Sequence, residues 1–272
     1  MNIKLVAIDI DGTLINDKHQ ITPEVKDAVQ QAKEQGIKIV IATGRPLPGV
    51  KDILDELNLN EEGDYVITYN GSLAQETATG KEHVRYGLSY DDYLEIDMLA
   101  RKLNVHMHTT TSERIYTSNR DISPYTIHEA YLVKMPLSYR TQEEMTMDLD
   151  IAKIMFIDEP DYLKEVIAKI PEWFKEKYMT VQSSPFFYEI LNKNAGKGAA
   201  LRALAKELEI DMSETMAIGD EENDLTMLEA AGLAIAMGNA TNPKVLAACD
   251  YQTASNNEHG VAKALWDFVL EK

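Results

Sequence analysis

Short apolar segments alternate with segments of helical periodicity at both ends of the chain, and this alternation restricts the possible folds more than any other feature. Residues 3–8 are apolar except for Lys4, a pattern typical of a strand that is buried on both faces. Thr22-Pro23 is typical of a helix start and Gly36 of a helix end. The elements predicted in this part are a strand at 3–8, a helix at 23–35, a strand at 37–42, a helix at 46–57 and a strand at 65–69. This order predicts a parallel sheet with right-handed crossovers.

The last part of the chain repeats the alternation, whereas the middle does not. The predicted elements at the end are a helix at 199–208, a strand at 215–218, a helix at 225–231, a strand at 233–236 and helices at 243–248 and 261–270. Those of the middle are a hairpin at Thr79-Gly80, a helix capped by Ser89, strands at 105–109, 152–157 and 180–184, and a helix at 161–170. We therefore predict a parallel α/β domain that is split in sequence by an inserted α+β domain.

Composition and charge argue against several classes of protein. The 272 residues are 44% hydrophobic and 26% charged, which is typical of globular domains. Because 45 acidic and 27 basic side chains give a formal net charge of −18, we expect neither a nucleic-acid partner nor binding to an anionic membrane. The single cysteine, Cys249, excludes an internal disulfide bond and any site that needs several cysteines. The apolar run at the start of the sequence contains Lys4, Asp9 and Asp11, which is unlike a secretory signal peptide. We therefore expect a cytoplasmic protein.

Four polar clusters follow predicted strands or begin predicted helices, and the first is Asp9-Ile10-Asp11-Gly12-Thr13. Two carboxylates two residues apart at a strand end can share a divalent cation, and Gly12 permits a tight turn beside them. A solvated turn is the alternative interpretation. An EF-hand loop is excluded, because it needs glycine at its sixth position and glutamate at its twelfth.

The second cluster, Thr43-Gly44-Arg45-Pro46, follows the strand predicted at 37–42. A hydroxyl group and backbone N–H groups directly before a helix can bind an anion. Ordinary helix capping is the alternative interpretation.

The third cluster, Gly196-Lys197-Gly198, begins a predicted helix. Lys197 therefore lies at the positive end of a helix dipole, where a cation is disfavoured unless solvent screens it or a ligand binds it. If Lys197 is a phosphate ligand, we expect its replacement by alanine to weaken catalysis by orders of magnitude while leaving the free energy of unfolding nearly unchanged. A Walker A loop is excluded, because residue 191 is leucine and Gly198 stands where serine or threonine belongs.

The fourth cluster, Gly219-Asp220-Glu221-Glu222-Asn223-Asp224, follows the strand predicted at 215–218. Its acidic side chains repel one another, and a bound cation would relieve this repulsion. Capping of the next helix is the alternative interpretation. Ligands of parallel sheets bind beyond the carboxyl ends of the strands, where these clusters would converge. Carboxylates for a cation, together with a lysine, a threonine and N–H groups for an anion, predict a phosphoryl-transfer site.

The four clusters, in this order, resemble the four motifs of the haloacid dehalogenase superfamily of phosphatases. The resemblance extends over the whole chain and is greatest to the Cof-type sugar-phosphate phosphatases, whose pattern Thr68-Tyr69-Asn70-Gly71 also matches. It implies a Rossmann-like parallel-sheet core with an inserted α+β cap domain of type C2. It also implies a phosphoric monoester hydrolase with Mg²⁺ as its cofactor.

The resemblance implies a role for each matching residue. Asp9 would attack phosphorus to form an aspartyl-phosphate, while Asp11 would protonate the leaving alcohol and then deprotonate the hydrolytic water. The residues implied to hold the phosphoryl oxygens are Ile10 by its amide, Thr43, Gly44, Lys197 and Asn223. Those implied to hold Mg²⁺ are Asp9, Asp11 by its carbonyl, Asp220, and Asp224 as a ligand or a supporting residue.

The spacing of the motifs places the inserted domain between the second and third clusters. About 30 residues separate Asp11 from Thr43, whereas about 150 separate Thr43 from Lys197. We therefore predict a core at residues 1–84 and 190–272 and a cap at 85–189. In such families the cap closes over the site and contacts the leaving group. The candidate specificity residues are Asn70, Glu189, Asn192 and Lys193, and an exposed strand end is the alternative interpretation of the last three.

These motifs predict hydrolysis of small phosphorylated metabolites, in particular sugar phosphates, by a monomer or homodimer. Two alternatives have the same motifs. A phosphomutase would return the phosphoryl group to a sugar, and a regulator would bind a phosphorylated metabolite without turnover.

Overall fold

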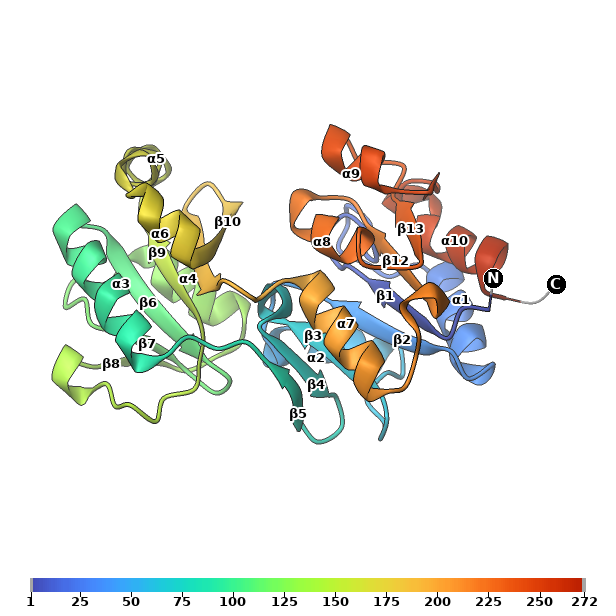
Figure 1. Cartoon of the computed structure of the whole chain (residues 1–272), viewed down its shortest axis with the longest axis horizontal. Helices are drawn as coiled ribbons and strands as arrows, with labels where there is room; N and C mark the ends of the chain where they lie inside the picture. The colour runs from blue at the N-terminus through green and yellow to red at the C-terminus, as the bar shows by residue number, and fades with distance from the viewer. Residues whose placement is uncertain (1, 271–272) are drawn as a thin grey trace. The chain divides into compact units, whose positions relative to one another are not determined.

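The computed structural model describes residues 2–270, which divide into two compact units (Figure 1). The first unit comprises Met1–Arg85 and Gly196–Lys272, and the second comprises Tyr86–Ala195. The sequence pattern places the second crossing after residue 189, within strand β11 (Phe187–Asn192). This strand pairs with β9 and β10 of the second unit, so the change of unit comes only after it.

A mainly parallel sheet forms the centre of the first unit. In the described part of the chain its eight strands lie in the order β14-β13-β12-β1-β2-β3-β4-β5, with only the pairs β3–β4 and β4–β5 antiparallel. The bounds are β1 Leu5–Ile8, β2 Lys38–Ala42, β3 Tyr65–Thr68, β4 Leu73–Glu76, β5 Glu82–Arg85, β12 Thr215–Gly219, β13 Leu233–Ala236 and β14 Tyr251–Gln252. The predicted parallel α/β fold is confirmed.

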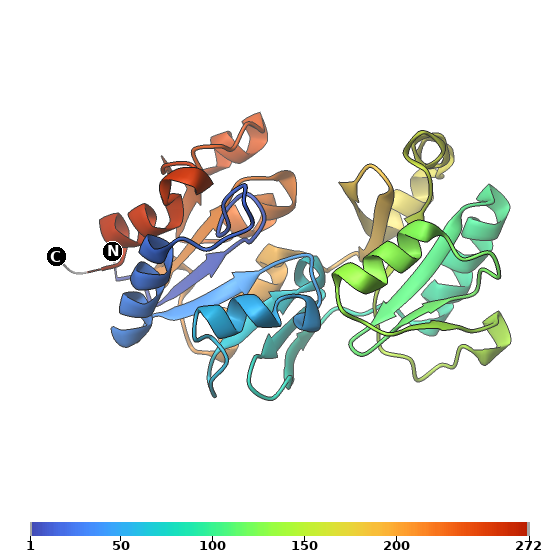
Figure 2. The same cartoon turned by 180° about the vertical axis from the view of Figure 1, so that it is seen from behind.

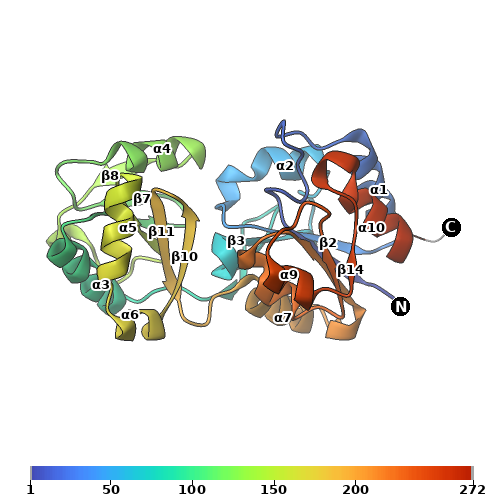
Figure 3. The same ribbon diagram turned by 90° about the horizontal axis from the view of Figure 1, so that it is seen from above.

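Helices cover both faces of this sheet. Figure 3 shows α1 and α10 on one face and α7 on the other. The bounds are α1 Pro23–Glu34, α2 Lys51–Glu56, α7 Lys197–Glu207, α8 Leu225–Leu228, α9 Pro243–Ala248 and α10 Gly260–Phe268. The continuous helix expected at 46–57 is wrong in its first turns, where residues 47–49 form a 3₁₀ turn before α2. Pro48 has no N–H to donate and Gly49 is a poor helix former, so the α-helix begins only after them.

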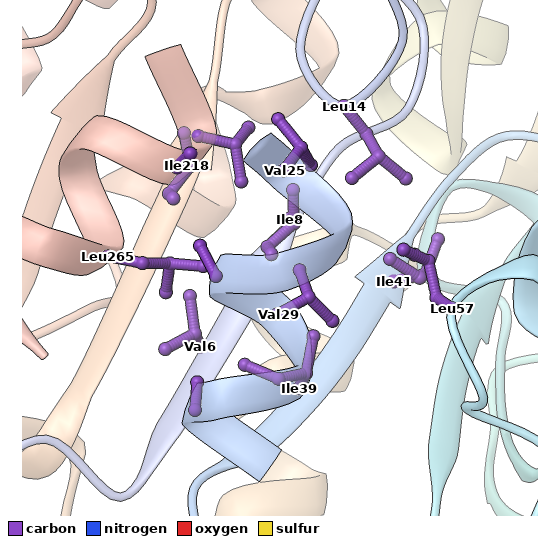
Figure 4. Close-up of a cluster of buried hydrophobic side chains, with 14 of the residues drawn as sticks. Val6, Ile8, Leu14, Val25, Val29, Ile39, Ile41, Leu57, Ile218 and Leu265 are labelled. Atoms are coloured by element: carbon purple, nitrogen blue, oxygen red, sulfur yellow. The ribbon is translucent and has the colours of Figure 1, made fainter. Parts of the chain in front are cut away.

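An apolar core holds α1 and α10, which lie side by side in Figure 2, against the sheet. Figure 4 shows Val25 and Val29 of α1 directed toward Val6 and Ile8 of β1, all of them buried. Burial of one such side chain contributes roughly 1.5–3 kcal/mol. Because Val6 and Ile8 alternate with residues of the opposite face, β1 is buried on both sides and its end is firmly held.

The second unit, all of whose residues are described, has an α+β architecture around the sheet β10-β11-β9-β6-β7-β8. Its strands are β6 His106–Thr111, β7 Ile115–Thr117, β8 Leu137–Tyr139, β9 Ile151–Ile157, β10 Tyr178–Ser184 and β11. Its helices are α3 Tyr90–Leu103, α4 Pro124–Leu132, α5 Pro160–Lys169 and α6 Glu172–Lys177. Alternate residues of β9 serve the two faces: Ile154 and Phe156 pack with α3, α5 and α6, whereas Met155 and Ile157 pack near Tyr125 of α4. Among residues 2–270, no helix has the length and hydrophobicity needed to span a bilayer.

Candidate active site

The loops at the carboxyl ends of β1, β2, β3 and β12 carry most of the predicted site residues. Strand β1 lies between β12 and β2, with Ile8 in register with Ile218 on one side and Ile41 on the other. Asp9 therefore leaves the sheet beside the ends of both neighbours, and its N–H donates to the carbonyl of Ile218 at 3.1 Å. Because β12, β1, β2 and β3 run parallel, clusters far apart in sequence meet at one edge of the sheet.

A buried ionic cluster lies at this edge. The ammonium group of Lys197 donates to the carboxylate of Asp9 and, at 2.7 Å, to that of Asp224. Lys197 and Asp224 are fully buried and Asp9 is only 6% exposed. The picture of Lys197 as a solvated residue at a helix start is therefore wrong: two carboxylates, not solvent, compensate its charge. The expectation that its loss leaves stability unchanged rested on that picture.

The first turn of α7, which carries Lys197, packs against the turn at Tyr69–Gly71. All three residues of this turn have positive φ values, 51° for Tyr69, 53° for Asn70 and 93° for Gly71. A Cβ atom on Gly71 would lie 2.2 Å from the carbonyl of Gly196. Only glycine permits this approach, so the turn determines where the Lys197 backbone begins its helix.

The loop after β12 is held by hydrogen bonds to its own acids. Oδ2 of Asp224 accepts from the backbone N–H groups of Asp220 at 3.0 Å and Glu221 at 3.2 Å. The hydroxyl group of Thr13 donates to Oδ1 of Asp220 at 2.8 Å. Two acids of this cluster, Asp220 and Asp224, are thus buried in the site, whereas Glu221 and Glu222 are exposed.

Three buried carboxylates could hold a metal ion. Oxygen atoms of Asp9, Asp220 and Asp224 lie within 4.8 Å of one another, a group found among the described residues. Burial, and then the nearby charge of Asp224, raises the pKa of Asp9 to about 8, although Lys197 acts in the opposite direction. Burial also raises the pKa of Asp220 to about 6. Three carboxylates face one ammonium group, and an all-oxygen set with excess negative charge suits a hard divalent cation such as Mg²⁺.

The carboxylate of Asp11 lies outside this group. Its side chain is 56% exposed and accepts two hydrogen bonds from the guanidinium of Arg45, at 2.6 and 3.1 Å. A carbonyl contact of Asp11 with a metal, which the resemblance implies, does not involve this carboxylate.

The predicted phosphate-binding residues lie around the same edge. The hydroxyl oxygen of Thr43 accepts from the N–H of Arg45 at 3.2 Å, and Thr43 is almost fully buried. Gly44 lies so close to the side-chain amide of Asn70 that a Cβ atom would approach it to 3.0 Å. Asn223 Nδ2 lies 3.4 Å from Oδ1 of Asn70. The side chain of Ile10 belongs to the apolar core, so only its backbone is available to a ligand.

The other candidate specificity residues belong to the second unit and differ from one another. Glu189 is buried and lies 3.3 Å from the ammonium group of Lys153, so an exposed strand end does not describe it. Asn192 donates to the carbonyl of Gly87 at 2.8 Å, whereas Lys193 is exposed. Their part in specificity stays a prediction.

Three further residues shape the site, and sequence reasoning assigned them no role. Arg45 pairs with Asp11, Thr13 holds Asp220, and Asn239 donates to the carbonyl of Gly12 at 2.8 Å. Arg45 and Thr13 stand inside the polar clusters, which is a usable signal. Asn239 is 227 positions from its partner, and no local pattern indicates that contact.

The chain matches the family of haloacid dehalogenase-like hydrolases over residues 6–265. It belongs to this family. The chain is 52% identical to "Putative phosphatase YxeH" of Bacillus subtilis over 269 residues, covering 99% of each chain. The structure of a haloacid dehalogenase-like hydrolase from Bacteroides thetaiotaomicron is 31% identical, with a TM-score of 0.85 over 97% of this chain and 99% of that one. The subclass IIB sugar phosphatase BT4131 is 25% identical, with a TM-score of 0.77 over 97% and 98% of the two chains.

These similarities confirm the resemblance seen in the four motifs. This chain is a phosphatase of the haloacid dehalogenase type, an enzyme that acts on phosphorylated substrates. The acidic group of Asp9, Asp220 and Asp224 provides it with residues that could bind a metal.

Proposed function

We propose that this phosphatase is Mg²⁺-dependent and hydrolyses small phosphorylated metabolites, sugar phosphates in particular, through an aspartyl-phosphate on Asp9. The observation that carries the proposal is the burial of Lys197 between Asp9 and Asp224, with Asp220 beside them. Burying a lysine among carboxylates costs desolvation energy. If these residues served only to stabilise the fold, apolar residues of similar volume would do so as well. As a phosphate ligand, the same lysine has a function that requires its charge.

The chain's own groups account for both chemical steps. An oxygen of Asp9 forms a bond to phosphorus while the bond from phosphorus to the leaving oxygen breaks, and Asp11 donates a proton to that oxygen. In the second step water attacks phosphorus, Asp11 takes a proton from the water, and the bond to Asp9 breaks. Inorganic phosphate leaves, and both aspartates return to their initial states.

Lys197, Thr43, Asn223 and the backbone N–H groups of Ile10 and Gly44 would orient the phosphoryl group for in-line attack. Asp9, Asp220 and Asp224, with the Asp11 carbonyl, would hold the Mg²⁺. When bound, Mg²⁺ neutralises negative charge on the phosphoryl oxygens and on the carboxylates around them. Without a cation, the surplus carboxylates of this edge would repel a phosphate ester, so the chain needs the metal to bind an anionic substrate.

Phosphate release from p-nitrophenyl phosphate, with Mg²⁺ and after treatment with EDTA, tests the proposal. We expect activity that EDTA abolishes, that added Mg²⁺ restores and that Asp9→Asn eliminates, because no neighbouring group replaces the attacking oxygen. A panel of sugar phosphates, nucleotides and small phosphorylated acids then tests the substrate class. Full activity of Asp9→Asn contradicts the covalent mechanism. A positional isomer of the substrate in place of inorganic phosphate indicates a phosphomutase, and Mg²⁺-dependent binding without turnover indicates a regulator.

A further inference from the structure

The contact between Arg45 and Asp11 joins the second polar cluster to the first. Nε of Arg45 donates to Oδ2 of Asp11 at 3.1 Å, and Nη2 donates to Oδ1 at 2.6 Å. Both carboxylate oxygens are thus held by one planar guanidinium. A two-point contact of this kind fixes the plane of a carboxyl group, which a single point charge does not.

The main chain at both ends of this contact is held independently. The N–H of Arg45 donates to the Thr43 hydroxyl at 3.2 Å, and the Arg45 carbonyl accepts from the N–H of Tyr69 at 3.2 Å. On the other side, Asp11 forms a backbone bridge with Ile15. The guanidinium therefore connects two loops, that of Arg45 and that of Asp11, whose main chains are each held by their own hydrogen bonds.

The Asp11 side chain itself has little other support. It is 56% exposed, and the Arg45 side chain is 32% exposed. An ion pair this exposed contributes little to stability because water screens it, so stability does not explain the contact. Its clear consequence is orientation: the guanidinium restricts a carboxylate that solvent would otherwise leave free to rotate.

We propose that Arg45 is a positioning residue for Asp11, holding this carboxyl group in the plane from which it exchanges a proton with the leaving oxygen and then with water. The inference rests on the proposed function, in which Asp11 is the acid and base. Arg45 exchanges no proton in either step, because a guanidinium stays protonated in proteins. It acts through Asp11 and need not touch the substrate.

This role predicts a dependence on the leaving group. A p-nitrophenolate leaves readily without a proton, whereas the phenolate of phenyl phosphate leaves less readily and gains more from Asp11. Arg45→Ala should therefore lower kcat/KM, which reports only the steps up to loss of the leaving group, by about 10- to 100-fold for phenyl phosphate, the scale of a misplaced catalytic group, and much less for p-nitrophenyl phosphate.

A double-mutant cycle tests the dependence on Asp11 directly. The variants are Arg45→Ala, Asp11→Asn and their combination, each assayed with both esters in the presence of Mg²⁺. In the Asp11→Asn background, Arg45→Ala should change kcat/KM by no more than about twofold, because there is no acid left to position. Arg45→Lys keeps the charge but not the planar two-point contact, so it should recover only part of the lost kcat/KM.

Arg85→Ala is the matched control. Arg85 makes a two-point contact with Glu82, at 2.6 Å for each bond, on strand β5 of the same unit. Its removal should leave kcat and KM for both esters unchanged, and thermal unfolding of every variant checks that the fold is retained.

Equal losses of kcat/KM on the two esters, or the same loss with and without the Asp11 carboxyl group, would overturn the positioning role and place Arg45 on the phosphoryl group instead. If the wild-type enzyme turns over both esters but the losses caused by Arg45→Ala and Asp11→Asn simply add in the double variant, this inference alone is overturned. Absence of turnover in the wild-type enzyme overturns the proposed function and this inference with it.

Discussion

Replacement of Lys197 by methionine provides the sharpest test of the buried cluster. Methionine fills a similar volume without the charge, so the change removes one ammonium group from between Asp9 and Asp224. Breaking a buried ion pair by removing one partner typically costs about 3–5 kcal/mol, because a buried charge is left uncompensated. We therefore expect the metal-free variant to lose about that much unfolding free energy near pH 7.5.

The direction of the pH dependence follows from the same carboxylates. The pKa of Asp9, raised to about 8 by burial, lies above both pH values, so it is Asp220 that titrates between them. Burial raises the pKa of Asp220 to about 6, and loss of Lys197 removes a charge that opposes this rise. A carboxyl group whose pKa is higher in the folded protein than in the unfolded chain stabilises the fold while it is protonated, and this stability is lost as the pH rises toward the folded pKa. The penalty of Lys197→Met should therefore shrink between pH 7.5 and pH 5.5.

Urea unfolding followed by circular dichroism at the two pH values measures this penalty, and kcat for p-nitrophenyl phosphate is measured on the same samples. We expect kcat to fall by roughly 10²–10³-fold, which is typical for the loss of one donor to a charged transition state. Lys206→Met is the control, because Lys206 is exposed on the same helix. If the unfolding free energies of the wild type and of Lys197→Met agree within about 0.5 kcal/mol at pH 7.5, the argument that Lys197 compensates buried charge is refuted.

Three further predictions follow from other features. Gly71→Ala should lower the unfolding free energy by on the order of 1–3 kcal/mol and reduce kcat, because its Cβ would meet the Gly196 carbonyl; Gly36→Ala, with a similar φ but open space, is the control, and equal effects would contradict the packing argument. Burial holds the pKa of His108 near 3, below its usual 6.5, so the unfolded chain binds more protons and stability should fall below pH 6.5, by about 2 kcal/mol at pH 5. Denaturant titrations from pH 7 to pH 5 should show a shallower fall for His108→Gln, and parallel curves would contradict this. Substitutions at exposed positions between residues 86 and 188 should alter the ranking of substrates more than the activity toward p-nitrophenyl phosphate, and unchanged ratios would place specificity in the first unit.

The order of strands and helices could be read from the sequence because its signals are local. Alternating burial, caps and glycines act over a few residues, which is why α9 was predicted with the bounds Pro243–Ala248 that the structure has. The approximate meeting of the clusters was also predictable, because parallel strands bring their carboxyl ends to one edge. The residue types in these clusters then indicated a site that binds a cation and an anion.

Burial and pairing of the individual side chains were decided only by the tertiary structure. Lys197 looks like an exposed lysine at a helix start until Asp9, 188 positions away, contacts it in the core. The two aspartates of the first cluster look alike in sequence, yet Asp9 joins the buried carboxylates and Asp11 turns outward to Arg45. Local sequence patterns indicate on which face of a helix or strand a residue lies, but not which residue from a distant part of the sequence contacts it. The energy of a charge depends on that partner, so only the folded chain determines what each charge does.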